Sequence, residues 1–134
     1  ALAIARHNAA ALNAKVEFLH EDILHPSASG RQWDAIVSNP PYICESEAQE
    51  MEEHVLSHEP HLALFVPDSD PLLFYRHIAR YAQKHLSEGG TLAFEVNRDY
   101  AQDIQNLLLE YGFVHATIFT DQFQNERMVL ATKP

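Results

Sequence analysis

Four consecutive residues, Asn39, Pro40, Pro41 and Tyr42, combine groups that could hold a planar amino group. The side chain of Asn39 carries a carbonyl oxygen, and each proline keeps its backbone carbonyl but has no N–H, so the segment is rich in hydrogen-bond acceptors. An –NH2 group could donate one proton to the Asn39 side chain and the other to the Pro40 carbonyl, while the ring of Tyr42 covers its flat face. The alternative interpretation is a rigid turn between a strand and a loop, without a ligand.

The position of this turn in the chain favours a binding site. Residues 33–38 (WDAIVS) are mostly apolar, which predicts a strand that is buried on both faces and ends at the turn. Residues 15–22 (KVEFLHED) predict an earlier strand that ends at Asp22. Open α/β sheets bind ligands outside the carboxyl ends of their strands, so we expect Asp22 and Asn39 on the same side of the fold.

The rest of the chain predicts alternating helices and strands. Helices are expected at residues 1–13, 45–56, 70–86 and 99–111, strands at 91–96, 113–121 and 126–133, and a short strand could form within 57–70. Asp70 and Pro71 are expected to cap and begin the third helix, Gly89 and Gly90 to end it, and Gly112 to end the fourth. The order predicts an α/β fold, a mostly parallel sheet with helices on both faces and an antiparallel C-terminal hairpin strand.

Composition and charge argue against several classes of protein. The chain has 134 residues, of which 46% are hydrophobic, and this suits one folded domain. No apolar run approaches the ~20 residues of a membrane-spanning helix, and nothing resembles a signal peptide. The formal net charge is −10, without a basic stripe, which argues against direct DNA binding. The single Cys44 cannot form an internal disulfide, which favours a reducing compartment, the cytoplasm.

The motif and its surroundings resemble a known family. SNPPY at the end of an apolar strand is similar to motif IV of the amino-methyltransferases that use S-adenosylmethionine. Within that group, the chain is most similar to the HemK-like protein-(glutamine-N5) methyltransferases of peptide chain release factors. The similarity follows essentially the whole chain through an ordered series of segments: DAIVSNPPYI, HEPHLAL, DPLLFYRHI, LSEGGTLAFEV and ERMVLATK.

This resemblance implies a fold, a reaction and a substrate. The fold would be the Rossmann-like one of S-adenosylmethionine-dependent methyltransferases, and a peptide chain release factor would be the protein substrate. Asn39, Pro40 and Tyr42 would be catalytic and, with Pro41, would bind the substrate glutamine. Because an amide nitrogen is a poor nucleophile, acceptors that grip its protons would orient it and stabilise the positive charge that develops on it.

The resemblance also implies a cofactor. Asp22, Ile23 and Asn39 would bind S-adenosyl-L-methionine, with Asp22 and Ile23 beside its adenine. No metal site and no membrane association are implied, and the oligomeric state is left open.

Some features of the family pattern do not occur in this chain. The four glycines form no G-x-G loop, although such a loop and a following acidic residue are expected in a complete cofactor site. The segments FVPDSDP and EVN also differ from the versions that are common in the family. We therefore expect residues 1–134 to be the C-terminal part of a catalytic domain that lacks its N-terminal part and is inactive alone.

Three alternatives remain open at this stage. A nucleic-acid methyltransferase that acts on N6 of adenine or N2 of guanine would use the same motif, but it would need a basic face. A non-catalytic α/β fragment would keep the turn as architecture only. His54 and His58 are four residues apart, so they could bind a metal from one face of a helix. Glu59 could position a substrate. The simpler interpretation is that all three residues are exposed on the surface.

Overall fold

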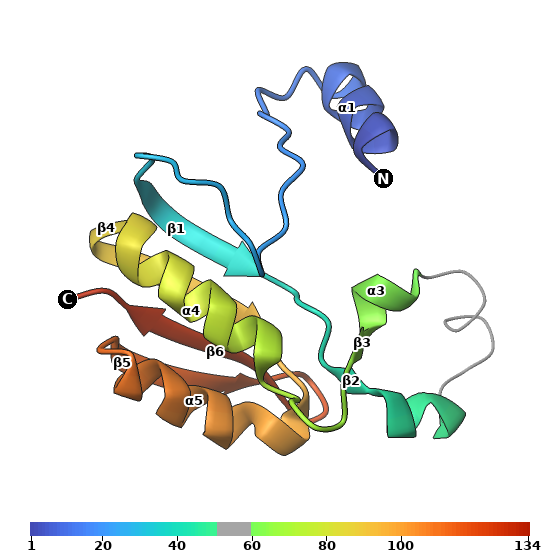
Figure 1. Ribbon diagram of the computed structural model, residues 1–134, viewed down its shortest axis with the longest axis vertical. Coiled ribbons are helices and arrows are strands. Elements are labelled where there is room, and N and C mark those ends of the chain that lie inside the picture. Colours follow the sequence, from blue (N-terminus) through green and yellow to red (C-terminus); the bar gives the residue numbers. More distant parts are fainter. Residues whose placement is uncertain (51–59) are drawn as a thin grey trace.

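The fold is built on a four-stranded sheet in the order β1–β4–β6–β5 (Figure 1). The computed structural model describes residues 1–50 and 60–134. The strands are β1 (Trp33–Ser38), β4 (Leu86–Glu95), β6 (Glu126–Thr132) and β5 (Val114–Thr120). β1 is parallel to β4, and β6 is antiparallel to both β4 and β5. Three strands therefore run in one direction and β6 runs against them, which confirms the predicted mostly parallel sheet with an antiparallel hairpin strand.

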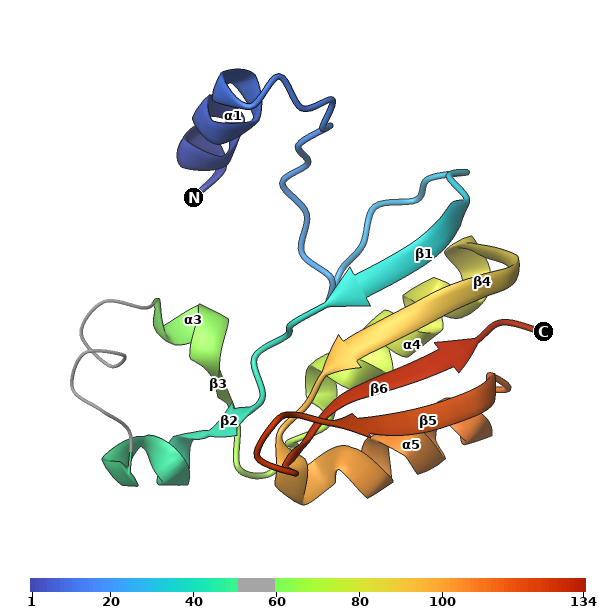
Figure 2. The ribbon, with the colours of Figure 1, turned by 180° about the vertical axis from the view of Figure 1, so that it is seen from behind.

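Helices α4 (Leu73–His85) and α5 (Ala101–Glu110) lie on the same face of the sheet, as Figures 1 and 2 show from opposite sides. α4 connects β1 to β4, and α5 connects β4 to β5, so both connections move in the same direction across the sheet. Right-handed crossovers that move in one direction place their helices on one face. The prediction of helices on both faces is therefore wrong for the residues that the structure describes.

A single hydrophobic core joins the two helices to the sheet. It combines Tyr75 of α4, Ile104 of α5, Leu92 and Phe94 of β4 and Val129 of β6, all of which are fully buried. Tyr75 meets Phe94 edge to face, with 5.0 Å between the ring centres. Because β4 lies between β1 and β6 and contributes to this core, it is the strand that fixes the position of β1 relative to the rest of the fold.

The two main helices begin and end for local reasons. α4 begins at Leu73, later than predicted, because the Asp70 carboxylate pairs with Arg76 instead of capping the helix, and Pro71 lies in the preceding turn. α5 ends at Glu110, and Gly112, which has φ 84°, terminates it as predicted. The N–H of Gly112 donates to the carbonyl of Leu109, and that of Phe113 to the carbonyl of Leu108, both at 3.0 Å, which is a Schellman ending.

Gly89 and Gly90 were expected to end α4, but this prediction is wrong, because both residues lie inside β4. α4 ends at His85, and Leu86 already belongs to the strand. The register then jumps from Trp33↔Leu86 to Ala35↔Thr91, so β4 carries a bulge opposite β1. Gly89 has φ 78°, which favours glycine at this point, and Gly90 lies against the backbone of both strands.

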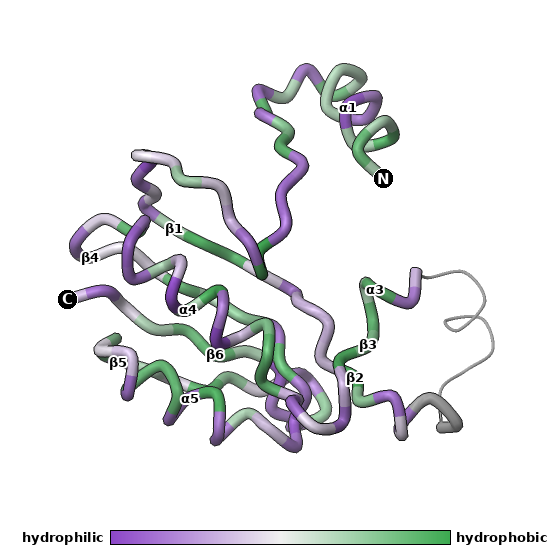
Figure 3. Tube along the Cα trace, in the orientation of Figure 1, coloured by the Kyte–Doolittle hydropathy of each residue, from purple (hydrophilic) through white to green (hydrophobic). Residues whose placement is uncertain are grey.

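Two predictions about the N-terminal third need correction. Residues 15–22 form no strand, because no described strand lies beside them to supply ladder hydrogen bonds. β1 is not buried on both faces, because it lies at the edge of the sheet and Val37 on the helix-free face is 80% exposed. Apolar residues nevertheless run along β1 (Figure 3). The predicted first helix is confirmed as α1 (Leu2–Ala11), which buries none of its side chains.

Shorter elements follow the turn at the end of β1. β2 (Ile43–Cys44) pairs in parallel with β3 (Phe65–Val66), which confirms a short strand within residues 57–70. The predicted helix at 45–56 is a 3-10 helix, η1 (Glu45–Glu50), as far as the structure describes it. The structure also contains α3 (His61–Leu64) and a second 3-10 helix, η2 (Arg98–Tyr100). No helix of the described residues is long and apolar enough to span a membrane.

Replacement of Gly90 by alanine should destabilise the protein by about 1–3 kcal/mol, because its Cβ would lie 2.8 Å from the Ser87 carbonyl oxygen and 3.0 Å from that of Asp34. Gly30→Ala is the matched control, since a Cβ there meets nothing within 4 Å. Urea denaturation of the two variants measures the difference. Equal midpoints for both variants would show that the Gly90 contact is not a packing constraint.

Candidate functional site

The Asn39–Tyr42 turn begins where β1 ends, beside the carboxyl end of β4. Ser38, the last residue of β1, pairs with Phe94. Pro40 is buried and anchors the turn, whereas Asn39 is exposed. The side chain of Asn39 makes no hydrogen bond to any residue that the structure describes, so its amide is accessible to a ligand. The predicted placement of Asn39 at the carboxyl end of a strand is thus confirmed.

A hydrogen bond between Tyr42 and Glu95 ties the turn to β4. The hydroxyl of half-buried Tyr42 donates to Glu95 Oε1 at 2.8 Å. The backbone carbonyl of Glu95 in turn accepts a hydrogen bond from the hydroxyl of core residue Tyr75 at 2.9 Å. Burial, followed by the hydrogen bond to the Glu95 carboxylate, raises the pKa of Tyr42 to about 12. The hydroxyl is occupied by Glu95, so a ligand would meet the ring of Tyr42.

Asn97 supports the same turn from the loop after β4. It is 8% exposed, and its Nδ2 lies 3.5 Å from the carbonyl oxygen of Tyr42 and 3.4 Å from both carboxylate oxygens of Glu47. Its Oδ1 accepts a hydrogen bond from the N–H of Asp99 at 3.1 Å. Asn97 therefore holds together the loop after β4, the turn and the start of η1.

Glu95 and Asn97 are residues that the sequence analysis missed. They belong to the segment EVN, which in the sequence stands out only as a departure from the family pattern. Their position in the sequence could have indicated a role in the site. Polar residues at the carboxyl end of a neighbouring parallel strand fall on the same side of the sheet as Asn39.

A cavity of about 680 Å³ lies on the proline side of the turn. It brings Asp22 and Ile23 together with Pro40 and Pro41, and Phe74 of α4 forms part of its wall. We call it the proline-side cavity. Four of the six predicted site residues therefore share one cavity, although they come from segments that are about twenty residues apart in the sequence.

Tyr42 lines a different cavity on the other side of the turn. This cavity of about 310 Å³ is shared with Glu47, Asn97 and Arg127, and Arg127 Nε donates to Asp121 Oδ2 at 3.3 Å. Asn39 lines neither of these two cavities. The turn therefore separates the predicted cofactor residues Asp22 and Ile23 from the ring of Tyr42.

The composition of the proline-side cavity fits a flat, partly apolar ring that carries an amino group, such as adenine. Ile23, Pro40 and Phe74 supply apolar surface, and Asp22 is the acceptor at its rim. Asp22 Oδ2 lies 3.0 Å from His25 Nδ1, and Oδ1 accepts the N–H of Leu24 at 2.9 Å. The contact with His25 has the larger effect, and together the two contacts lower the pKa of Asp22. Its carboxylate is therefore ionised at neutral pH and can accept hydrogen bonds.

The metal alternative falls outside what the structure describes. His54, His58 and Glu59 lie within residues 51–59. Among residues 1–50 and 60–134, no group of three or more His, Cys, Asp or Glu side chains could hold a metal ion.

Comparison with known proteins identifies relatives of this chain. A family model described as "Methyltransferase small domain" matches residues 1–62. A release factor glutamine methyltransferase of Bacteroides thetaiotaomicron is 44% identical over 134 residues, which is 99% of this chain and 48% of that protein. By sequence, the chain is a homologue of the release factor glutamine methyltransferases. The protein of the same name from Flavobacterium psychrophilum is 42% identical over 96% of this chain and 45% of its own length.

Solved structures confirm the fold class of these methyltransferases. A protein-(glutamine-N5) methyltransferase (release factor-specific) from Alicyclobacillus acidocaldarius is 28% identical, with TM-score 0.50 over 78% of this chain and 50% of its own. A methyltransferase from Pyrococcus furiosus, 17% identical, matches the fold with TM-score 0.64 over 96% of this chain and 55% of its own. The resemblance, the fold class and S-adenosyl-L-methionine as the methyl donor of this family are thus confirmed. The chain spans about half the length of the curated relatives it matches.

Loss of the Tyr42 hydroxyl should weaken the fold around the turn. Tyr42→Phe leaves the Glu95 carboxylate without this partner, so we expect a destabilisation of about 1–3 kcal/mol. The control is Tyr111→Phe, because the Tyr111 hydroxyl accepts a hydrogen bond from Arg80 in an exposed setting, and its loss should cost less than about 0.5 kcal/mol. Urea denaturation of the natural protein that contains this chain gives both values, and an equal loss for both variants would contradict the assignment.

The raised pKa of Tyr42, caused first by burial and then by the hydrogen bond to Glu95, predicts a pH dependence of stability. Unfolded tyrosine loses its proton near pH 10, whereas folded Tyr42 keeps it up to about pH 12. The contribution of Tyr42 is therefore complete below pH 10 and is lost as the pH rises from about 10 to about 12. Denaturation curves across this range should show a smaller loss for Tyr42→Phe than for the unchanged protein. Parallel curves for the two proteins would be the contrary result.

Proposed function

We propose that the natural protein containing this chain transfers a methyl group from S-adenosyl-L-methionine to the side-chain amide nitrogen (N5) of a glutamine in a peptide chain release factor. The observation that carries the proposal is the exposed Asn39 amide, which has no hydrogen-bond partner among the described residues and projects from a turn fixed by Pro40 and Tyr42. The relatives named for this reaction support the choice of substrate.

In this proposal, the two sides of the turn have different roles. Asp22 and Ile23, with Asn39, hold the cofactor, whose sulfonium group supplies the methyl. The apolar surface of the proline-side cavity and the ionised Asp22 support this role. Pro41 fixes the backbone of the turn, because its φ is restricted by its ring.

Asn39, Pro40 and Tyr42 act on the glutamine amide. Its lone pair is delocalised, so the nitrogen must be held in one orientation to react. The Asn39 side-chain oxygen and the Pro40 carbonyl accept its two N–H protons, and the ring of Tyr42 lies against its plane. The nitrogen becomes positively charged as it gains the methyl group, and the two acceptors stabilise this charge. One N–H proton then leaves to solvent.

Residues 1–134 are, in this proposal, the C-terminal part of the catalytic domain of a cytoplasmic protein. The alternative of a nucleic-acid methyltransferase has less support, because the chain has 19 acidic against 9 Lys and Arg residues.

The test is methyl transfer by the natural protein from labelled S-adenosyl-L-methionine to a release factor and to DNA in parallel. Label should appear on a glutamine of the release factor. Asn39→Ala should reduce kcat on the order of 100-fold or more, because a preorganised group at the reacting atom is lost. Asn106→Ala, at an exposed position of α5, is the control and should leave the rate unchanged. Label on DNA alone, or full activity of Asn39→Ala, would contradict the proposal.

A further inference from the structure

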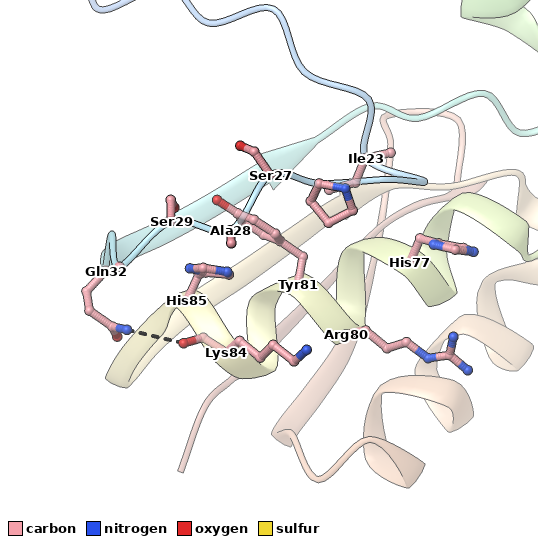
Figure 4. A pocket seen from close by; sticks show the side chains of 12 residues that line it. Ile23, Ser27, Ala28, Ser29, Gln32, His77, Arg80, Tyr81, Lys84 and His85 are labelled. Carbon is pink, nitrogen blue, oxygen red and sulfur yellow. Dashed lines mark hydrogen bonds between the residues drawn. The ribbon is translucent and has the colours of Figure 1, made fainter.

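The cavities of this fold differ in whether they contain the Tyr42 ring. A cavity of about 710 Å³ lies between α4 and the connection that precedes β1, where Gln32 Nε2 donates to the Lys84 carbonyl oxygen at 3.2 Å (Figure 4). It contains no residue of the Asn39–Tyr42 turn. The cavity of about 310 Å³ that Tyr42 shares with Asn97 is here called the Tyr42-side cavity. Its residues are the ones placed to act on the position of the ring.

Asn97 has the one amide or charged side chain that is buried among the described residues. Burial of an amide is unfavourable unless its polar atoms have partners, so a buried amide constrains the groups around it. Its Oδ1 accepts the N–H of Asp99 at 3.1 Å. This contact also fixes the orientation of the amide, because a flipped Nδ2 would face a second donor. Nδ2 must therefore face the turn.

The backbone on both sides of Asn97 is tied to the rest of the fold. The N–H of fully buried Val96 donates to the Arg127 carbonyl at 2.9 Å. The N–H of Tyr100 donates to the Asn97 carbonyl at 3.0 Å. The Asn97 amide is therefore a fixed point that can set the position of the turn.

The Nδ2 group of Asn97 faces three acceptor oxygens from two residues. It lies 3.5 Å from the carbonyl oxygen of Tyr42 and 3.4 Å from each carboxylate oxygen of Glu47. Two N–H protons serve three oxygens, and each contact is longer than a typical hydrogen bond. Glu47 Oε1 also accepts the N–H of Cys44 at 3.0 Å. Asn97 and Glu47 together therefore hold the backbone that follows the prolines.

Tyr42 is consequently held at two points. Its hydroxyl donates to Glu95 Oε1 at 2.8 Å, and its carbonyl oxygen faces Asn97. The first contact sets the direction of the ring, and the second sets the backbone from which the ring projects. A ring fixed at both points can keep a planar amide in one orientation, and orientation strongly affects the rate of a reaction between bound groups.

We propose that Asn97 is a positioning residue for methyl transfer, which acts with Glu47 through the Tyr42 carbonyl to orient the Tyr42 ring against the glutamine amide. Asn97 does not itself touch the amide. The cofactor is not affected, because neither Asn97 nor Glu47 lines the proline-side cavity. This inference rests on the proposed function.

Asn97→Asp tests the proposal, because it keeps an oxygen that accepts from Asp99 and replaces only the Nδ2 donor. The new carboxylate would face that of Glu47, so the turn should shift. In the natural protein, kcat with the release factor should fall at least about tenfold, whereas KM for the release factor and Kd for S-adenosyl-L-methionine should each change less than about twofold. Asn106→Asp makes the same change at an exposed position of α5 and should leave all three values unchanged.

Exchange of the two groups should restore the activity. In the double variant Asn97→Asp with Glu47→Gln, the amide at position 47 can donate to the carboxylate at position 97, so kcat should return to within about threefold of the unchanged protein. Glu47→Gln alone keeps an acceptor for the N–H of Cys44 and for Asn97, and it should also lose less than about threefold. The proposal is overturned if the double variant shows no recovery, or if KM or the cofactor Kd changes as much as kcat.

Backbone hydrogen exchange separates this inference from the proposed function. The N–H groups of residues 39–44 should exchange at least about threefold faster in Asn97→Asp than in the unchanged protein, while those of α5 keep their rates. If the unchanged protein transfers no label to a release factor, the proposed function fails. The exchange rates then decide whether Asn97 holds the turn, and equal rates in both proteins would overturn that role.

A second variant removes the same contact from the other side, in case Asn97→Asp does not fold. Glu47→Ala deletes the carboxylate and leaves Asn97 in place. It should lower kcat at least about threefold relative to Glu47→Gln, without a change in the cofactor Kd. Equal kcat values for the Ala and Gln variants would contradict the proposal.

Discussion

The parallel ladder between β1 and β4 is the contact on which the candidate site depends. Its register places Ser38 beside Phe94, so the residues that follow each strand emerge next to one another. The hydrogen bond from Tyr42 to Glu95 then fixes the turn to β4, and β4 is itself fixed by the core through Phe94 and Tyr75. The position of Asn39 therefore follows from strand pairing rather than from the conformation of a loop.

Local patterns in the sequence were sufficient for much of the fold. The apolar periodicity of α4 and α5, the Schellman ending at Gly112 and the C-terminal hairpin all depend on residues that are close in the sequence. The same holds for the placement of Asn39 at a strand end. The start of α4 was predicted too early, because Asp70 pairs with Arg76 rather than with the first N–H groups of the helix.

Interactions between distant segments could not be predicted in this way. The strand at residues 15–22 was expected from its composition, but a strand also needs a neighbour, and composition does not supply one. Tyr42 and Glu95 are 53 residues apart, and Asn97 meets Glu47 across 50. These pairs become visible only when the order of the strands is known, which is why the supports of the turn were missed while the turn itself was found.

The edge position of β1 has a consequence for how the site can be assembled. Among the described strands, β1 has a partner only in β4, so its outer row of backbone N–H and carbonyl groups is unpaired. An extended segment of almost any sequence can add to such a row, since backbone groups supply the affinity. A strand added at this edge would give β1 a partner on each side, just before Asn39. The conformation of the Asn39–Tyr42 turn would then depend on a second polypeptide segment.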